Sequence, residues 1–352
     1  MLTVLSVSYP LAKVSANTAG GAEQVLATLD QELVRTGHRS IVLAPAGSRC
    51  HGLLIPAQIP SGTLDTRAKQ EARRTFKQLL NLALQHYPID VVHMHGLDFS
   101  EYLPEHDVPV VVSLHLPLSW YAPEALRPAR PNTTLVCVSN GQAQTAPSDI
   151  QPLRVIHNGV DLTVLHPARR HGDYVVALGR ICPEKGFHLA LDAAQLAEIK
   201  LILAGSVFEY PEHREYFERM IRPRLTGRAR FVGAVGGERK AHLLAGARCL
   251  LAPSLAPETS SLVAMEAMAS GTPVIAWRSG ALAEIVRDGR TGFLVNTAEQ
   301  LAEAITEAGL IDRSECRRYA EQRFSSKQMA GLYIDLYKSV LAETSILELQ
   351  AA

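Results

Sequence analysis

PETSSLVAMEAMASGTPVIA spans residues 257–276 and places a charged residue inside an apolar helix-forming run. The segment follows the apolar run CLLAPS (249–254) and ends in a second one, PVIAW (273–277). A strand, a helix and a strand in this order form a βαβ unit with parallel strands. Glu258 lies ahead of the predicted helix and Glu266 within it. Burying a carboxylate without a partner costs several kcal/mol, so this segment predicts a binding role as well as a fold.

The same alternation of strand and helix runs through the chain of 352 residues. Continuous Val, Ile and Leu runs between helices are typical of a parallel sheet covered on both faces. The predicted strands are 2–8, 40–45, 89–95, 108–115, 135–140, 153–159, 174–179, 200–205, 229–235, 249–254 and 273–277. The predicted helices are 21–37, about 66–86, about 260–269 and about 327–343, with two more beginning near 186 and 238. The sequence therefore predicts an α/β fold.

A polar, proline-bearing segment at 160–173 interrupts this alternation. The chain is also about twice as long as a typical domain. We therefore predict two doubly wound domains, residues 1–165 and 166–326, with a hinge near 160–172. Ligands of such sheets bind beyond the carboxyl ends of the strands, so candidate site residues should follow strands.

The composition argues against several classes of protein. Thirty-five basic residues balance thirty-five acidic ones, which favours no nucleic-acid partner. No run approaches the length of about eighteen apolar residues, and the N-terminus lacks a basic n-region, so we expect neither a membrane span nor a signal peptide. Reduced thiols and a cytoplasmic location are predicted by the odd number and scattered positions of Cys50, Cys137, Cys182, Cys249 and Cys316.

Two cations follow the first strand of the predicted second domain. Arg180 comes directly after this strand, and Lys185 comes just before a predicted helix. Cations beside a helix N-terminus can form a phosphate site, because the helix amides and dipole also favour anions. A solvated pair of basic residues on a loop is the alternative interpretation.

The start of the helix at 260–269 offers further anion donors. Ser260 and Ser261 are predicted N-caps, and the first amides, including that of Leu262, should face the same strand ends. Glu266 could accept two hydrogen bonds from vicinal hydroxyls such as those of a ribose. The alternative is a structural glutamate paired with a buried cation or with the backbone.

The predicted first domain carries weaker signals. Gly20 and Gly21 open its first helix and permit close backbone approach, but no GxGxxG follows the first strand, which argues against a nicotinamide oxidoreductase. His115 ends a strand and should face the ligand edge of the sheet. His93 and His95 share one face of a strand, which could be half a metal site. No carboxylate or cysteine stands at ligand spacing, so packing is the preferred interpretation.

Two more features concern partners. The chain contains no Asp-x-Asp, the pair that commonly holds a divalent ion on a sugar-nucleotide diphosphate, so we expect neither a metal nor another cofactor. The helix at 66–86 carries a basic face that could contact a membrane surface or an acceptor. A solvated helix face is the preferred interpretation, because Glu71 interrupts the basic residues and the net charge is zero.

Together these motifs resemble glycosyltransferase family 4, a group of retaining glycosyltransferases with the GT-B fold. The resemblance covers nearly the whole chain, and its specificity lies in the order and spacing of the motifs. Its parts are the Gly-Gly-x-Glu helix GGAEQVLATLDQELVRTGH (20–38), the connector VIHNGVDLTVLHP (155–167), the basic site ALGRICPEKG (177–186), the Glu-x7-Glu block (257–276) and its tail SGALAEIVRDGRTGFLV (279–295).

The resemblance implies two Rossmann-like domains facing a central cleft, with the C-terminal helix 327–352 packing back on the first domain. By this resemblance, Arg180 and Lys185 would bind the donor diphosphate together with the helix-start amides, and Glu266 would bind the ribose. Glu258 would touch the donor sugar, with His115 opposite it. The Gly20–Gly21 backbone would lie over the distal phosphate. In place of the family's usual glycine-rich stretch after the first glutamate stands Thr259-Ser260-Ser261, which leaves the donor-sugar pose open.

The implied activity is retaining, metal-independent transfer of a sugar from a nucleoside-diphosphate donor, with a UDP-sugar favoured, in carbohydrate biosynthesis. The acceptor would be a sugar, a lipid-linked saccharide or a small molecule, and the site of action the cytoplasm or the inner face of a membrane. A non-catalytic nucleotide-sugar-binding protein is the rival of another class. Within the enzyme class, a hydrolase or phosphorylase using the same cleft remains an alternative.

Overall fold

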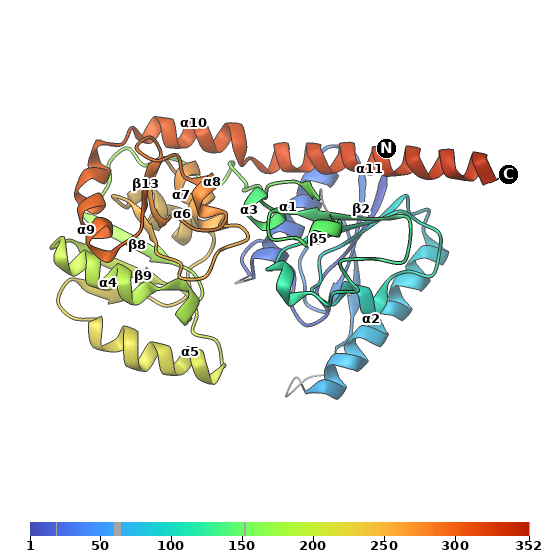
Figure 1. Cartoon of the computed structure of the whole chain (residues 1–352), viewed down its shortest axis with the longest axis horizontal. Helices are drawn as coiled ribbons and strands as arrows, with labels where there is room; N and C mark the ends of the chain where they lie inside the picture. Colours follow the sequence, from blue (N-terminus) through green and yellow to red (C-terminus); the bar gives the residue numbers. More distant parts are fainter. Residues whose placement is uncertain (19, 60–64, 151–152, 352) are drawn as a thin grey trace. The chain divides into compact units, whose positions relative to one another are not determined.

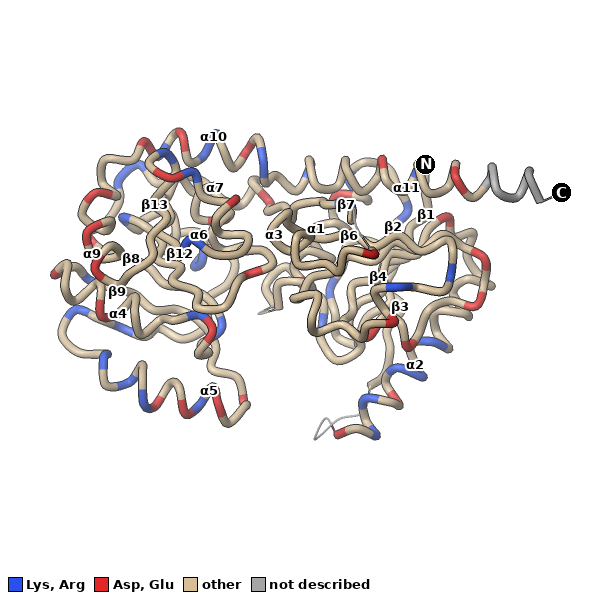
Figure 2. Tube along the Cα trace, in the orientation of Figure 1, with Lys and Arg blue, Asp and Glu red and all other residues tan. Residues whose placement is uncertain are grey.

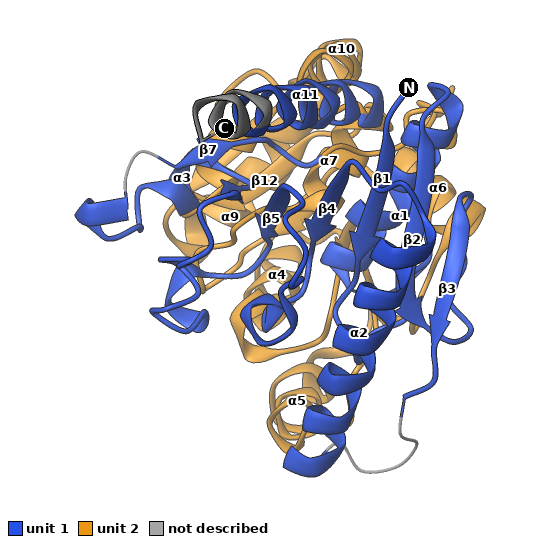
Figure 3. Ribbon diagram, turned by 90° about the vertical axis from the view of Figure 1, so that its right-hand side faces the viewer, with its two compact units in different colours: residues 1–158, 326–352 blue, residues 159–325 orange. Residues whose placement is uncertain are grey.

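A computed structural model describes residues 1–18, 20–59, 65–150 and 153–351, with side chains up to residue 344. It divides into two compact units, Met1–Asn158 with Ser326–Ala352 and Gly159–Ser325 (Figure 3). The final residue of the predicted C-terminal segment, 352, lies outside the described residues. The first boundary falls before the predicted one at 165, because the Val160 N–H donates to the Phe324 carbonyl at 2.8 Å, inside the second unit.

The first unit, coloured blue to green with the red C-terminal helix in Figure 1, contains a seven-stranded parallel sheet in the order β3-β2-β1-β4-β5-β6-β7. Its strands are β1 (Thr3–Val7), β2 (Arg39–Pro45), β3 (Leu53–Ala57), β4 (Val91–Met94), β5 (Val110–Leu114), β6 (Thr133–Cys137) and β7 (Arg154–Val155). Its α-helices are α1 (Gly21–Arg35), α2 (Thr66–His86), α3 (Asn140–Ala143) and α11 (Ser326–Ala351), and short 3-10 turns cover Phe99–Tyr102, Leu118–Trp120 and Ser148–Ile150.

Both faces of this sheet are covered, which explains its continuous apolar strands. Along β2, Ile41 packs in the core on the α2 side, whereas Val42 packs with residues of α1. Successive strand residues point to opposite faces, so a strand buried on both faces needs an unbroken apolar run. The C-terminal α11 belongs to this unit, where the Ser326 hydroxyl donates to the Glu32 carboxylate of α1 at 2.7 Å.

The second unit is a six-stranded parallel sheet in the order β10-β9-β8-β11-β12-β13. Its strands are β8 (Tyr174–Leu178), β9 (Lys200–Ala204), β10 (Ala229–Phe231), β11 (Leu250–Ala252), β12 (Val274–Trp277) and β13 (Gly292–Val295). Its α-helices are α4 (Phe187–Leu196), α5 (Pro211–Tyr216), α6 (Gly237–Gly246), α7 (Leu262–Ala269), α8 (Leu282–Ile285), α9 (Ala298–Glu307) and α10 (Arg313–Arg323). Shorter turns cover Pro183–Lys185, Arg222–Arg224 and Ala308–Leu310, and a π-helical turn covers Phe217–Ile221.

The two sheets share one winding rule, and it locates the ligand edge of each. In both, the chain winds outward from a central strand and then returns to that strand's other side. The point of reversal lies between β1 and β4 in the first unit and between β8 and β11 in the second. In open α/β sheets the loops at the carboxyl ends of such a strand pair form the ligand crevice.

Several predicted elements differ from the structure. The strand predicted at 153–159 is only Arg154–Val155, because β7 pairs with β6 at these two residues alone. The strand predicted at 229–235 ends at Phe231, since Gly233 has a positive φ of 70°. The edge strand β3 was not predicted, because Pro56 interrupts its pattern. The short strand β13 was not predicted either.

The basic helix α2 buries one face, and most of its charged residues, marked along the trace in Figure 2, lie on the other. Its Asp65 N-cap accepts a hydrogen bond from the Ala68 N–H at 2.8 Å. Two of its cations have acidic partners within the unit: Arg73 contacts Asp98 at 2.6 Å, and Lys77 contacts a glutamate at 3.0 Å. Among the described residues, no helix combines the length and the apolar character needed to cross a membrane.

Candidate active site

The loops after β8 and β11 are bound to each other at the reversal point of the second sheet. Gly186 has a positive φ of 62°, and a Cβ there would stand 2.2 Å from the Pro253 carbonyl oxygen. The Leu255 N–H donates to the Glu184 carbonyl at 2.8 Å, which joins the two loops directly. Only glycine permits this approach at position 186. The sequence between β8 and α4 thus fixes the backbone that carries Lys185.

Lys185 and Glu258 meet across these two loops. The Lys185 Nζ lies 2.9 Å from the Glu258 Oε1, and the two side chains are only 26% and 11% exposed. The Ser254 hydroxyl, just beyond β11, also donates to this carboxylate oxygen. A carboxylate this little exposed needs such partners, because its desolvation would otherwise be costly. The structure therefore brings together a predicted phosphate ligand and the predicted sugar ligand.

The backbone of Glu258 is held from a third segment. The Ala281 N–H donates to the Glu258 carbonyl at 2.8 Å. Gly280 has a positive φ of 53°, and a Cβ there would lie 2.6 Å from that carbonyl oxygen and 2.7 Å from the Glu258 nitrogen. The segment after β12 therefore fixes the main chain of Glu258 independently of its side-chain partners.

Two serine hydroxyls at the start of α7 are buried without hydrogen-bond partners. The helix begins at Leu262, and the Ser261 carbonyl accepts from the Met265 N–H at 3.1 Å. Ser261 is the N-cap residue of α7, as predicted, but its side chain makes no capping hydrogen bond, and neither does the Ser260 hydroxyl. Unsatisfied buried hydroxyls cost about 1–3 kcal/mol each. Together with the unpaired first amides of the helix, they leave donors for a ligand.

Glu266 is buried in the second turn of α7 with a cation as its partner. The Lys240 Nζ of α6 lies 2.5 Å from the Glu266 Oε1, and the side chains are 14% and 10% exposed. This is the arrangement of the alternative interpretation, a structural glutamate paired with a partly buried cation. The pair satisfies one oxygen of the Glu266 carboxylate and leaves its second oxygen to accept from another donor.

Arg180 lies apart from these pairs in its contacts. Its guanidinium stacks over the Phe208 ring at 5.7 Å, and the side chain is exposed. An exposed arginine that stacks on a ring gives up little interaction energy when its guanidinium turns toward an anion. The described contacts therefore place Arg180 on the predicted loop but show no ion pair with the site glutamates.

In the first unit, His115 directly follows β5 and pairs with a second histidine. The His115 Nε2 lies 3.0 Å from the His95 Nδ1, and the rings stack with an interplanar angle of 14°. Burial lowers the pKa of His115 to about 4, and burial also lowers the pKa of His95. Both rings are therefore neutral near pH 7, and the His95 Nε2 is buried without a partner.

His93 is part of a hydrogen-bond network with α11 rather than half a metal site. Its Nδ1 lies 2.7 Å from the Tyr337 hydroxyl, and its Nε2 lies 2.8 Å from the Ser113 hydroxyl. The Tyr333 hydroxyl completes the network at 2.6 Å from Ser113. Because both ring nitrogens have partners, the packing interpretation of His93 is the one the structure supports.

Gly20 caps α1 at the reversal point of the first sheet. A Cβ at Gly20 would lie 1.9 Å from a carboxylate oxygen of Glu23, so this carboxylate covers the glycine. Burial raises the pKa of Glu23. Gly21, the first residue of α1, is exposed. The structure thus gives Gly20 a local packing reason beside its predicted phosphate role.

Sequence reasoning missed four residues that hold the site glutamates in place: Ser254, Lys240, Gly280 and Ala281. Ser254 stands two residues after the end of β11, and this strand-end position is the signal that could have found it. Lys240 is 26 residues away from Glu266, and nothing in the local pattern joins them.

Comparison with known proteins agrees with this geometry. The family model for glycosyltransferase family 4 matches residues 19–164, and that for glycosyl transferases group 1 matches residues 172–308. D-inositol 3-phosphate glycosyltransferase from Nocardioides sp. is 32% identical over 231 residues, covering 56% of this chain and 50% of the relative. The chain thus spans about half the length of the curated relatives it matches first.

Solved structures extend the likeness along the chain. AviGT4, a glycosyltransferase involved in avilamycin A biosynthesis, has a TM-score of 0.74 at 26% identity over 97% of this chain and 99% of its own. HepE from Anabaena, solved in complex with UDP and glucose, has a TM-score of 0.73 at 21% identity over 96% of this chain and 100% of its own. With its two doubly wound sheets and both family models matched in order, the chain belongs to glycosyltransferase family 4 and has the GT-B fold.

Proposed function

We propose that this chain is a retaining glycosyltransferase that moves a sugar from a nucleoside-diphosphate donor, with a UDP-sugar favoured, to an acceptor hydroxyl. The observation that carries the proposal is the ion pair of Lys185 and Glu258 at the reversal point of the second sheet, 2.9 Å apart. Beside it, Ser260 and Ser261 hold buried hydroxyls without partners. A cation and hydroxyl donors suit a diphosphate, and a carboxylate suits sugar hydroxyls. The UDP bound to the related fold of HepE supports the same donor class.

The proposed chemistry follows from where charge develops. Breaking the bond between sugar and diphosphate builds positive charge on the sugar and negative charge on the leaving group. Arg180, Lys185 and the first amides of α7 stabilise that leaving group, at about 1.5–3 kcal/mol for each charge-assisted contact. The Glu258 carboxylate, released from Lys185 by the diphosphate, then opposes the positive charge on the sugar. Retention of the anomeric configuration is proposed from the family resemblance. In this scheme the leaving phosphate takes the proton of the acceptor hydroxyl.

Glu266 and His115 receive supporting roles in this proposal. Glu266 accepts hydrogen bonds from ribose hydroxyls while the contact with Lys240 orients its carboxylate. His115 contacts the sugar as a neutral imidazole, because burial lowers its pKa to about 4. Gly20 and Gly21 offer backbone near the distal phosphate. No metal is assigned a role, since cations and amides can neutralise the leaving group.

The acceptor is proposed to be a hydroxyl of a sugar, a lipid-linked saccharide or a small molecule. The basic face of α2 supports a membrane surface as a source of a lipid-linked acceptor. We propose that the enzyme acts in the cytoplasm or at the inner face of a membrane. Binding of the full chain to vesicles with and without anionic lipid would separate the two locations.

A panel of nucleotide sugars tests the proposed function. Thermal shift should single out one donor, which at 100 times its dissociation constant stabilises by about 2.7 kcal/mol. Transfer should then require an acceptor, keep the anomeric configuration and persist in excess EDTA. Binding without transfer to any acceptor would favour the non-catalytic binding protein, and sugar release to water would favour a hydrolase. Loss of transfer in EDTA with recovery in magnesium would contradict metal independence.

A further inference from the structure

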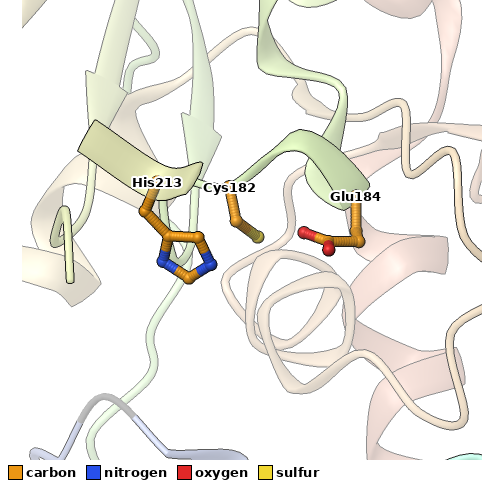
Figure 4. Close-up of side chains that lie close together, drawn as sticks. All are labelled: Cys182, Glu184 and His213. Atoms are coloured by element: carbon orange, nitrogen blue, oxygen red, sulfur yellow. The ribbon is translucent and has the colours of Figure 1, made fainter. Parts of the chain in front are cut away.

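Three metal-ligating side chains of different kinds converge in the second unit (Figure 4). Cys182 and Glu184 come from the loop after β8, and His213 comes from α5. The thiol sulfur, a carboxylate oxygen and an imidazole nitrogen all lie within 4.8 Å of one another. Figure 4 shows the Glu184 carboxylate and one ring nitrogen of His213 both directed toward Cys182. Ligand atoms at this spacing can reach one ion with only small side-chain movements.

Ordinary packing satisfies the thiol of this cluster but not its imidazole. His213 is about 9% exposed, and its Nδ1 is buried without a hydrogen-bond partner. Cys182 is fully buried, its sulfur lies 3.6 Å from the Arg180 carbonyl, and its thiol also hydrogen-bonds to the Glu184 side chain. The cluster therefore offers one thiol, one carboxylate and one imidazole within reach of a common ion.

We propose that Cys182, Glu184 and His213 bind one Zn²⁺ ion. One sulfur, one nitrogen and one oxygen ligand suit zinc, whereas magnesium and calcium prefer oxygen ligands alone. Three protein ligands leave the fourth tetrahedral position to water. On binding, the thiol proton leaves to solvent as the sulfur–zinc bond forms. Binding of one Zn²⁺ ion and release of one proton together add one net positive charge to this part of the molecule.

The added charge has a predictable effect on the neighbouring loop. Cys182 and Glu184 stand between Arg180 and Lys185 in the sequence, and zinc would tie this loop to α5. Resting on the proposed function, which places the donor diphosphate at Arg180 and Lys185, the extra positive charge strengthens diphosphate binding. Zinc would therefore be a regulator of donor affinity and no participant in the transfer itself. Chelation should weaken donor binding but leave transfer at saturating donor.

Calorimetry with Zn²⁺ alone and the full chain tests the site without any donor. One ion should bind per chain. The variants Cys182→Ser, Glu184→Gln and His213→Gln should each lose about 100-fold or more in zinc affinity, beyond what loss of an outer partner costs. Glu184 is exposed and acts in the fold through its carbonyl, so Glu184→Gln keeps the fold if the buried variants do not.

Two control variants match these substitutions elsewhere in the chain. Cys50→Ser removes a partly exposed thiol that, like Cys182, has a histidine and a carboxylate in its surroundings: the adjacent His51 lies 3.9 Å from Asp30. His242→Gln removes an exposed histidine of α6. Both should keep wild-type zinc affinity. In the cobalt-substituted protein, thiolate charge-transfer absorption should appear in wild type and in Cys50→Ser but not in Cys182→Ser. Absence of stoichiometric zinc binding, or its survival in Glu184→Gln and His213→Gln, overturns the site.

A second titration separates the site from its effect on the donor. Saturating Zn²⁺ should tighten UDP binding at least about fivefold in wild type and leave it unchanged in His213→Gln. Zinc bound at the three residues without any change in UDP affinity would retain the site and overturn its regulatory role. Absence of UDP binding with and without zinc would contradict the proposed donor, while the calorimetric result for zinc would stand by itself.

Discussion

The reversal points of the two sheets have the same winding and opposite chemistry. In the second unit, the loops beyond β8 and β11 carry the charged pair Lys185–Glu258. In the first unit, the strand ends carry His95 and His115, whose pKa values burial lowers. The fold thus fixes where a ligand can lie, and the residues after the strands decide whether the site presents charge. Under the proposed function, the charged unit receives the leaving group and the neutral unit contacts the sugar.

The largest expected effect tests the charged unit at Glu258. Glu258→Gln should lower turnover on saturating donor by about 10²–10³, as for loss of a preorganised electrostatic group, while nucleoside diphosphate still binds. Steady-state kinetics and calorimetry with free nucleotide measure the two quantities, and Glu303→Gln, exposed on α9, is the matched control. Lost nucleotide affinity with normal turnover would reverse the roles of the two site glutamates.

Glu266 should show the complementary behaviour. Glu266→Gln is expected to weaken nucleoside diphosphate about 10- to 100-fold, because charge-assisted hydrogen bonds to the ribose contribute about 1.5–3 kcal/mol. Calorimetry with nucleotide measures this, with Glu238→Gln on the exposed face of α6 as control. If Glu266→Gln binds nucleotide like wild type, Glu266 is only the structural partner of Lys240.

The neutral histidines predict an acid-sensitive first unit. The ordinary histidine pKa of about 6.5 applies to the unfolded chain, whereas His115 has a pKa of about 4 when folded. Between these values protons bind the unfolded chain preferentially, so the free energy of unfolding falls as pH drops below about 6.5. For His115 this amounts to about 2 kcal/mol at pH 5.

Fluorescence can follow this unit alone, since the two tryptophans, Trp120 and Trp277, lie in different units. In a Trp277→Phe background, urea unfolding should show a lower free energy of unfolding at about pH 5 than at about pH 7. Adding His115→Gln should remove the part due to that residue, and His242→Gln should not. An equal loss with and without His115 would show that this ring binds a proton as readily in the folded state as in the unfolded chain.

The smallest expected effect concerns the docking of α11 on the neutral unit. Tyr337→Phe keeps the ring but leaves the His93 Nδ1 without its partner at 2.7 Å. We expect a loss of about 1–2 kcal/mol in the free energy of unfolding, measured by urea denaturation. Turnover per folded molecule should stay unchanged, and a large loss of turnover would tie the network to the chemistry.

The sequence predicted the winding and the strand-end residues because both follow from local patterns. Buried parallel strands leave unbroken apolar runs, and Arg180, Lys185 and Glu258 each come soon after such a run. Edge strands such as β3, with Pro56, lack that signal. The site residues that follow a strand could therefore be predicted from the sequence wherever that strand is fully buried.

Contacts between residues that are distant in the sequence could not be predicted. The tyrosine whose hydroxyl hydrogen-bonds to His93 is 244 residues away, and the lysine that pairs with Glu266 comes from another helix. The serines before α7 fit a capping pattern, yet their hydroxyls make no such bond. Local propensity was overruled there by tertiary packing, which sets the geometry of the loop after β11.

The close contact of Gly280 with the main chain of Glu258 has a consequence for engineering the enzyme. The glutamate backbone is anchored from outside its own loop, whereas the hydroxyls of Ser260 and Ser261 support nothing in the fold. Replacing these serines with Gly or Ala should therefore keep the fold, whereas larger side chains would not fit at the buried position 261 and any side chain at 280 would displace the glutamate. A library aimed at new donor sugars should hold Gly280 constant and limit positions 260 and 261 to small residues.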